Sequence, residues 1–388
     1  MGPGPSDVPA RVLAALGQPT VGHLDPQFVA LMDETKRLLQ YLFQTKSELT
    51  LPISAPGSSA MEACFVNLLE AGDKVIVCRN GVFGLRMTEN VERSGAQAVT
   101  IDDEWGQPVS LDKLAEAIKA NPDAKVIAFV HAETSTGAQS DAQAIAKMAQ
   151  DAGMLTIMDC VTSLGGTPVK IDEWGIDAAY SGSQKCLSCV PGIAPITFGE
   201  KAQQVIQNRK QKVQSWFSDQ NLIMAYWGGG AKRAYHHTAP VNNVYALHES
   251  LLMIKKEGLE IAWARHAQNH QALKAGLQVM GIEFVVDEAH RLPQLNAVTI
   301  PEYADDAATR SQLLSEFNLE IGAGLGALAG KVWRIGLMGH SSSQHNVEFC
   351  LNALETSLLA QGGQFEKGAA IAAAQAVYQN AKQSTAVS

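Results

Sequence analysis

The segment KVIAFVHAETSTGAQSDAQAIAKMAQDAGMLTIMDC, Lys125 to Cys160, carries the pattern that decides the fold. The apolar run at 125–131 predicts a buried strand, the periodic stretch at 141–151 predicts a helix, and the apolar run at 154–160 predicts a second strand. A strand, a helix and a strand in this order are typical of parallel strands joined by a crossover helix. Strands that are apolar throughout fit a sheet that is covered on both faces.

The same alternation continues on both sides of this segment. Further strands are predicted at 74–78, 96–101, 177–181 and 193–199, and further helices at 60–69 and 111–120. The repetition indicates an α/β fold with a mostly parallel sheet. The C-terminal third has a different order of elements. It begins with one long helix over about 245–275, in which Gly258 is a candidate break. Strand-like runs follow at 282–286, 295–301 and 332–339, and a last helix at 346–359. This order predicts a smaller α+β domain.

A chain of 388 residues is too long for one compact core, so we expect two domains. The predicted division is an N-terminal arm at 1–20, a large domain at 21–255, a small C-terminal domain at 256–363 and a tail at 364–388. The tail is rich in Ala and Gln, and its pattern leaves open an extra helix or a frayed end.

Composition and charge exclude several classes of protein. The net charge is -9 and no dense Lys/Arg cluster occurs, so we expect no nucleic-acid partner. No apolar run reaches the roughly 20 residues that span a bilayer, so we expect no membrane association. The six cysteines are irregularly spaced, which favours reduced thiols in a cytoplasmic protein. Cys186 and Cys189 form a lone C-x-x-C, which predicts packed thiols and no metal site.

Ligands in parallel α/β sheets bind beyond the carboxyl ends of the strands, so polar residues there are candidates for a site. The stretch SAPGSSAMEA, Ser54 to Ala63, places small and hydroxyl residues directly before a predicted helix. Free backbone N–H groups at a helix start suit a phosphate group. An ordinary N-cap by Ser58 or Ser59 explains the same residues equally well.

Three further candidates follow later strands. Asp159 ends one strand, where a carboxylate needs a cation or hydrogen-bond donors, although a helix cap also explains it. The segment HAETSTG offers Glu133, Thr134 and Ser135, which turn capping explains just as well. Lys185 follows YSGSQ, and an ordinary solvated lysine in a loop is the simple alternative for it. A desolvated lysine, however, has a lowered pKa, and its neutral amine forms a Schiff base with an aldehyde. A lysine, an aspartate and a phosphate-sized anion site together suggest pyridoxal phosphate.

Seven motifs occur in one order along the chain: GPGPSDVP (2–9), NGVFGLR (80–86), ETSTG (133–137), MDCVTSLGG (158–166), YSGSQK (180–185), YHHTAPVNNVYAL (235–247) and KVWRIGLMG (331–339). Through these motifs the chain resembles the class V pyridoxal-phosphate aminotransferases, and within them the alanine–glyoxylate and serine–glyoxylate (serine–pyruvate) aminotransferases. The resemblance implies fold type I, with a large domain on a mostly parallel seven-stranded sheet and a smaller α+β domain. It also implies a homodimer with active sites at the subunit interface.

The resemblance implies roles for individual residues. Lys185 matches the lysine that binds the cofactor aldehyde, and Asp159 matches the aspartate at the ring nitrogen. Phe83 matches the aromatic residue over the ring, and Thr134 the residue at the ring hydroxyl. Arg334 matches the arginine that binds the substrate carboxylate, for which its planar fork is suited. The residues that match the phosphate cup are Gly57, Ser58 and Gln184, with Tyr235 and Thr238 from the partner subunit.

Two positions depart from the family pattern. Pro56 stands where relatives often have a hydroxyl residue, which weakens part of the expected phosphate contact. Phe83 stands where relatives often have tryptophan. Simple alternatives also remain for two motifs, namely an exposed strand position for Arg334 and a plain turn for YHHT at 235–238.

The resemblance implies ping-pong transamination, through a Schiff base, from alanine or serine to glyoxylate or pyruvate. It implies that the freed amine of Lys185 moves a proton from the substrate Cα to the C4′ carbon of the cofactor, as general base and then acid. Pyridoxamine–pyruvate and ureidoglycine–glyoxylate aminotransferases remain as sister alternatives. A cysteine desulfurase or related lyase is disfavoured, because Gln184 precedes the lysine and residues 318–331 contain no cysteine. A nicotinamide dehydrogenase is disfavoured, because GAGLGALAG (322–330) does not fit G-x-G-x-x-G. A binding protein without catalysis would not need Lys185.

Overall fold

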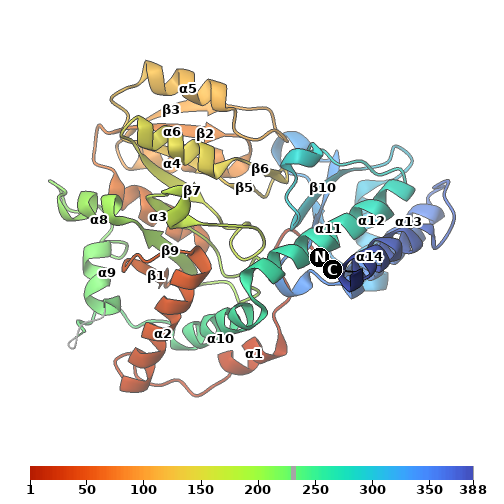
Figure 1. The fold of residues 1–388 in the computed structure, drawn as a ribbon, viewed down its shortest axis with the longest axis horizontal. Helices are drawn as coiled ribbons and strands as arrows, with labels where there is room; N and C mark the ends of the chain where they lie inside the picture. Colours follow the sequence, from red (N-terminus) through yellow and green to blue (C-terminus); the bar gives the residue numbers. More distant parts are fainter. Residues whose placement is uncertain (229–232, 388) are drawn as a thin grey trace.

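The computed structural model describes residues 1–228 and 233–387, and a seven-stranded sheet lies at its centre (Figure 1). The spatial order is β1-β9-β8-β7-β4-β2-β3. Strand β9 runs antiparallel to both neighbours, and the other neighbouring pairs are parallel, so the predicted mostly parallel sheet is confirmed. In chain order the strands are β1 (Thr50–Ile53), β2 (Lys74–Arg79), β3 (Gln97–Asp102), β4 (Val126–Val130), β7 (Leu155–Asp159), β8 (Ala178–Tyr180) and β9 (Ala194–Phe198).

Helices pack on this sheet as its apolar strands require. Strands β4 and β7 are buried along their whole length. Helices α3 (Gly57–Leu68) and α4 (Val82–Arg93) contact each other and the sheet, as do α5 (Leu111–Ala120) and α6 (Ala142–Asp151). Because α3 and α4 begin just after β1 and β2, their first turns lie at the carboxyl-end edge of the sheet, where ligands bind in this architecture.

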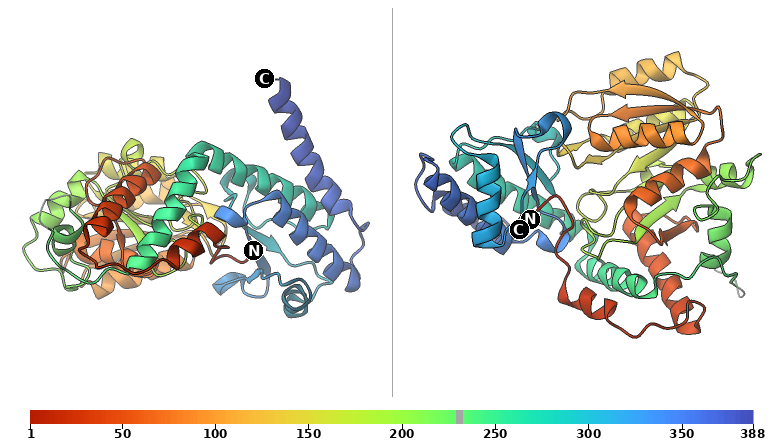
Figure 2. Two further views of the ribbon diagram at one scale, coloured as in Figure 1. Left: turned by 90° about the horizontal axis from the view of Figure 1, so that it is seen from below. Right: turned by 180° about the vertical axis from the view of Figure 1, so that it is seen from behind.

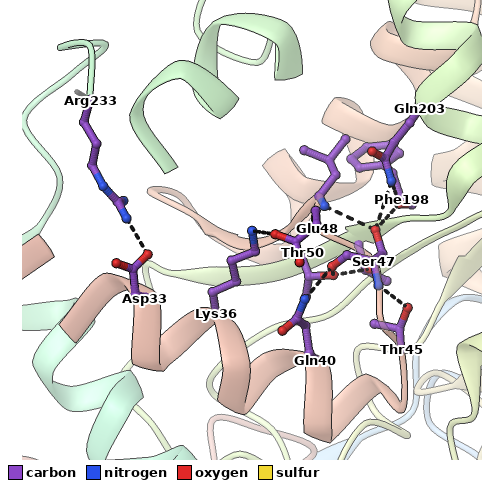
Figure 3. A network of polar contacts seen from close by, with 12 residues as sticks. Asp33, Lys36, Gln40, Thr45, Ser47, Glu48, Thr50, Phe198, Gln203 and Arg233 are labelled. Carbon is purple, nitrogen blue, oxygen red and sulfur yellow. Dashed lines mark hydrogen bonds and ion pairs between the residues drawn. The ribbon is translucent and has the colours of Figure 1, made fainter. Parts of the chain in front are cut away.

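The polar network in Figure 3 joins helix α2 (Pro26–Phe43) to the β1–β9 edge of the sheet. Lys36 of α2 forms an ion pair of 2.5 Å with Glu48. Ser47 Oγ donates to the carbonyl of Phe198 at 2.5 Å, and Gln203 Nε2 donates to the same carbonyl at 2.9 Å. These bonds hold β1, which leads directly into the N-terminus of α3.

The C-terminal part contains a small antiparallel sheet of order β10-β12-β11. Its strands are β10 (Leu295–Thr299), β11 (Gly322–Ala323) and β12 (Val332–Gly336), and its helices are α11 (Leu259–Val279), α12 (Asp306–Phe317), α13 (Gln344–Ala360) and α14 (Ala369–Val387). The strand expected at 282–286 is wrong, because only an isolated bridge from Phe284 to Val298 forms there. The candidate break in the long helix is confirmed, because α10 (Val241–Glu257) ends at Gly258, whose φ of +90° separates it from α11.

Two hydrophobic cores organise the chain. One surrounds the seven-stranded sheet, and the other lies between the small sheet and helices α11, α13 and α14. Of the alternatives for the tail, the extra helix is confirmed: α14 packs on α11 and α13, and the Tyr378 hydroxyl donates to Asn269 Oδ1 at 2.7 Å. Residue 388 of the tail lies outside the described residues. No helix within 1–228 and 233–387 is long and apolar enough to cross a bilayer.

The N-terminal arm runs between the two parts before helix α1 (Ala10–Leu16) begins. Figure 2 shows the start of the chain beside the small sheet. Gly336 of β12 donates its N–H to the carbonyl of Met1 at 2.8 Å, and Ser6 donates its N–H to the carbonyl of Gln184 at 2.8 Å. The arm is therefore bonded both to the small sheet and to the segment that contains Lys185.

Candidate active site

Lys185 lies half-buried in the turn after β8. Burial and the charge of Arg334 lower the pKa of Lys185 to about 8, against the opposing influence of Cys186 and Asp159. Its Nζ donates a hydrogen bond to the carbonyl of Pro3 in the N-terminal arm. A lowered pKa increases the share of neutral amine, which is the form that attacks an aldehyde.

Asp159 is the buried last residue of β7, and its parallel neighbour in β8 is Tyr180. The Tyr180 hydroxyl donates to Oδ2 at 2.8 Å, and the N–H of Val161 donates to Oδ1 at 2.9 Å. Burial raises the pKa of Asp159 to about 6, while these hydrogen bonds and the charges of Lys185 and Arg86 lower it. The carboxylate is thus mostly ionised at pH 7. It caps a turn and no helix, so the helix-cap alternative is wrong.

The N-terminus of α3 is open to an anion. Its N-cap residue is Pro56, and no side chain forms a cap hydrogen bond, so the alternative of an N-cap by Ser58 or Ser59 is wrong. A Cβ added to Gly57 would lie 3.2 Å from the carbonyl oxygen of Ser181, so a glycine here lets the helix start approach the strand end closely. The N–H groups of Gly57 and Ser58 make no hydrogen bond among the described residues and remain available to a ligand, whereas the N–H of Ser59 donates to the carbonyl of Pro56 at 2.9 Å.

Arg334 lies on β12 with only 7% of its surface exposed, so the alternative of an exposed strand residue is wrong. Its Nε donates to the carbonyl of Ala323 at 2.8 Å, and its Nη1 donates to the carbonyl of Thr134 at 3.2 Å. Its Nη2 makes no hydrogen bond within the described part of the chain. Burial lowers the pKa of Arg334, while the charge of Glu133 raises it. One edge of a held guanidinium is therefore left for a carboxylate.

Thr134 and Phe83 lie on two different elements of the same edge. Thr134 is buried, and its Oγ1 is 2.5 Å from Oγ1 of Thr162. Phe83 is half-buried in the first turn of α4, and the guanidinium of Arg86 lies over its ring at 5.0 Å. Arg86 Nη1 also donates to Ser58 Oγ at 3.2 Å, which links the first turns of α4 and α3.

Tyr235 and Thr238 are exposed, and within this chain no hydrogen bond between described residues joins them to Lys185. Their hydroxyl oxygens are 3.4 Å apart. The neighbouring His237 Nε2 is 2.7 Å from Oγ of Ser54, so the YHHT segment lies against the loop before α3. The structure brings this segment to the anion site through His237, and leaves Tyr235 and Thr238 free to face another molecule.

Two side chains at this site were not predicted from the sequence: Tyr180 contacts Asp159, and Arg86 contacts Phe83 and Ser58. Glu133, a candidate from HAETSTG, is fully buried. Burial raises the pKa of Glu133 to about 7. The spacing of Phe83 and Arg86 by three residues on a helix was a usable signal, because such residues share a face.

The C-x-x-C cysteines are buried and unpaired. Burial raises the pKa of both Cys186 and Cys189 to about 12, so neither is a thiolate at neutral pH. No set of three or more His, Cys, Asp and Glu side chains in 1–228 and 233–387 is placed to hold a metal ion.

The family model for aminotransferase class V matches residues 3–348. The chain belongs to the class V aminotransferases. It is 38% identical to (S)-ureidoglycine–glyoxylate transaminase of Bacillus subtilis over 100% of this chain and 97% of that protein. It is 39% identical to alanine–glyoxylate aminotransferase of Oryctolagus cuniculus over 92% of each. The crystal structure of an alanine–glyoxylate aminotransferase from Nostoc sp. superposes with a TM-score of 0.90 at 45% identity, covering 92% of this chain and 94% of that one.

As a class V aminotransferase of fold type I, the protein uses pyridoxal phosphate, and the residues present fit that cofactor. The start of α3 has no side-chain cap and suits a phosphate. The buried Oε1 of Gln184 has no hydrogen-bond partner among the described residues. Because Oε1 can only accept, the NH₂ group of this side chain is the donor that a phosphate oxygen would require. Asp159 and Lys185 supply an anion and an amine whose charges interact.

Proposed function

We propose that this class V aminotransferase transfers the amino group of alanine or serine to glyoxylate or pyruvate. The observation that carries the proposal is the narrowness of the space beside Lys185. The carbonyl of Pro3 accepts from Lys185 Nζ, and a Cβ added to Gly4 would lie 2.6 Å from the same Nζ. With the single free edge of Arg334 for one carboxylate, a small monocarboxylate fits best. The names of all three relatives include glyoxylate, which supports that acceptor.

Pyridoxal phosphate, when bound, supplies an aldehyde that joins amino groups and a ring that takes up electrons from the substrate Cα. In our proposal Lys185 holds the aldehyde, Asp159 faces the ring nitrogen, Phe83 covers the ring and Thr134 faces the ring hydroxyl. Arg334 orients the substrate by its carboxylate. Once the substrate amino group has displaced it from the aldehyde, Lys185 would act as a neutral amine that takes the proton from the substrate Cα and delivers it to the cofactor aldehyde carbon, which its lowered pKa favours.

The proposed phosphate site consists of Gly57, Ser58 and Gln184, with Tyr235 and Thr238 from the partner subunit. Pro56 supplies neither an N–H group nor a hydroxyl, but the N–H groups that follow it in α3 have no side-chain cap and can compensate. Phosphate is therefore the anion that we assign to this cup.

We also propose that the protein is a homodimer with the active sites at the subunit interface. Tyr235 is 61% exposed and Trp216 is 62% exposed, and Phe217 and Leu222 add further exposed apolar surface. Large exposed aromatic side chains of this kind are typical of protein interfaces. Light scattering after gel filtration should give about twice the monomer mass of 41.4 kDa. A monomer would contradict both the dimer and the shared phosphate cup.

We also propose a division into domains and a cellular compartment. The large domain, about 21–255, carries the cofactor, and the small domain, 256–363, carries Arg334, with the arm and the tail joined to them. The cytoplasm is the proposed compartment, because all six cysteines are buried and unpaired.

A direct experiment tests the cofactor chemistry. Purified protein should be yellow, and borohydride should fix the cofactor to Lys185, as read by peptide mass spectrometry. The Lys185→Arg variant should bind the cofactor only reversibly and lose activity. Lys36, another largely buried lysine, should stay unlabelled and serves as the internal control. Colourless protein that does not respond to added pyridoxal phosphate would refute the proposal.

A panel of donors and acceptors tests the substrates. Alanine or serine with glyoxylate should be among the best pairs, with ping-pong kinetics. Ureidoglycine–glyoxylate transamination is the second candidate, because the B. subtilis relative matches this chain over its full length. Activity confined to a ureido donor would favour that candidate, and activity confined to pyridoxamine with pyruvate would place the protein in the other sister subgroup.

A further inference from the structure

Helix α4 begins without a cap of its own. Its N-cap residue is Gly81, and no side chain next to it in sequence bonds the first-turn N–H groups. Phe83 and Arg86 lie in this first part of the helix and contact each other. The orientation of the proposed ring-covering residue therefore depends on whatever else satisfies the start of α4.

Two fully buried side chains just after β4 supply the missing acceptors, namely Glu133 of the short strand β5 (Ala132–Glu133) and Ser135. The N–H of Val82 donates to Ser135 Oγ at 3.1 Å, and the N–H of Phe83 donates to Glu133 Oε2 at 3.2 Å. Ser135 in turn donates from its N–H and its hydroxyl to Glu133 Oε1, at 3.0 and 2.6 Å. Both oxygens of the carboxyl group are thus used, and when it is ionised its negative charge lies at the positive end of the helix.

Gly81 leaves the space that this arrangement needs. A Cβ at position 81 would lie 2.4 Å from Cγ and Cδ of Glu133 and 2.5 Å from Oγ of Ser135. Its φ of 171° is extended backbone that any residue can adopt. The glycine is therefore required for room and not for backbone conformation.

We propose that Glu133 and Ser135 are positioning residues, which form an external cap on α4 and thereby hold Phe83 over the cofactor ring. They touch neither reacting atoms nor cofactor in this arrangement, and they act through the backbone of Val82 and Phe83. The inference rests on the proposed role of Phe83. Loss of a cap weakens the start of a helix, so the ring-covering side chain loses its fixed place.

The cap itself is tested without cofactor. Hydrogen exchange of the Val82 and Phe83 amides, read by fragmentation mass spectrometry on the cofactor-free protein, should be about 3- to 30-fold faster in Ser135→Ala. Glu133→Gln should act similarly, because its NH₂ group cannot accept from Phe83 or Ser135. Ser140→Ala is the matched control, since buried Ser140 also accepts a backbone N–H, from Val109 at 3.1 Å, away from α4.

The positioning role is tested on the cofactor-loaded protein. The dissociation constant of pyridoxal phosphate should rise about 3- to 30-fold in Ser135→Ala and Glu133→Gln, and stay unchanged in Ser140→Ala. The absorption band of the bound cofactor should shift in the first two variants only. In a Phe83→Leu background, Ser135→Ala should cause no additional loss of affinity, because its effect passes through Phe83.

Three results would overturn the inference: unchanged amide exchange in both variants, faster exchange with unchanged cofactor affinity, or a full additional loss in the Phe83→Leu background. Should one variant fail to fold, the other carries the same comparison. If the wild-type protein does not bind pyridoxal phosphate, the proposed function fails, and the positioning role fails with it. The exchange experiment alone then still decides whether the external cap exists.

Discussion

The hydroxyl of Tyr180 offers a sharp test of how the site controls the charge of Asp159. Replacing Tyr180 by Phe removes the donor 2.8 Å from Oδ2 and keeps the buried ring. The N–H of Val161 then remains the carboxylate's one hydrogen-bond donor among the described residues. Because the hydrogen bond favours the ionised form, its loss should raise the pKa of Asp159.

The size of the effect follows from the charge on the acceptor. A hydrogen bond to a charged group is worth about 1.5–3 kcal/mol, and one pKa unit corresponds to about 1.4 kcal/mol. The pKa of Asp159, about 6 in the cofactor-free protein, should therefore rise by about 1–2 units. At pH 7 the ionised fraction of Asp159 should fall from about 90% to about 10–50%. Affinity for a cofactor that pairs with this carboxylate should drop about 2- to 10-fold.

The assay is a cofactor titration between pH 5.5 and 8.5. The ratio of dissociation constants between Tyr180→Phe and wild type should be largest at the acid end of this range and shrink toward pH 8.5, where Asp159 is ionised in both proteins. In an Asp159→Asn background, Tyr180→Phe should have little further effect, since no charge remains to be held. Tyr378→Phe is the control, because Tyr378 also buries its ring and donates to a side-chain oxygen, that of Asn269 at 2.7 Å in the small domain. Superimposable titrations, or an equal loss in the Asp159→Asn background, would refute the reasoning.

Three further predictions concern Lys185, Arg334 and Glu133. The rate at which cofactor-free protein binds pyridoxal phosphate, measured by stopped-flow absorbance, should rise about tenfold per pH unit up to about pH 8 and then level off. The reason is that the pKa of Lys185 is about 8, so the neutral amine predominates above that pH. A rate that continues to rise up to pH 10 would contradict this. Arg334→Lys should raise KM for the amino donor about 10- to 100-fold with a smaller change in kcat, and an unchanged KM would exclude Arg334 from carboxylate binding. Glu133 has a pKa of about 7 in the folded protein, against 4.5 for the ordinary group. The protonated side chain therefore contributes to the free energy of unfolding, fully below about pH 4.5 and progressively less as the pH rises to 7. In Glu133→Gln, the free energy of unfolding measured in urea should therefore lose a decrease of about 1.4 kcal/mol per pH unit between about pH 4.5 and 7. The same pH dependence in the variant and the wild type would contradict the raised pKa of Glu133.

Local pattern was sufficient for the long, strongly apolar elements. The runs that became β4 and β7 are buried on both faces, and such strands leave a clear compositional signal. Strand β1 has four residues, one of them Pro52, and gave no such signal. Helix α4 was missed because its cap comes from residues 133 and 135, far from its own start. The break at Gly258 was anticipated only as a candidate, because periodicity continues across it.

The identity of the chemistry was already present in the linear order of the motifs. Lys185 and Asp159 were recognisable by residue type and by the strand that precedes them, whereas Arg334 was implied only by the resemblance to the family. Their roles at the site remain proposals that the variants above test. Residue type and local period carry this information because they depend on neighbours within a few positions.

The arrangement of the site came from contacts across long stretches of chain. The bond from Lys185 to Pro3 joins residues 182 positions apart, and the bond from Arg334 to Thr134 joins residues 200 positions apart. No local pattern encodes such pairs, because they form only when the two cores and the arm pack together. The close approach of the arm to Lys185 and the free edge of Arg334 are therefore properties of the folded chain.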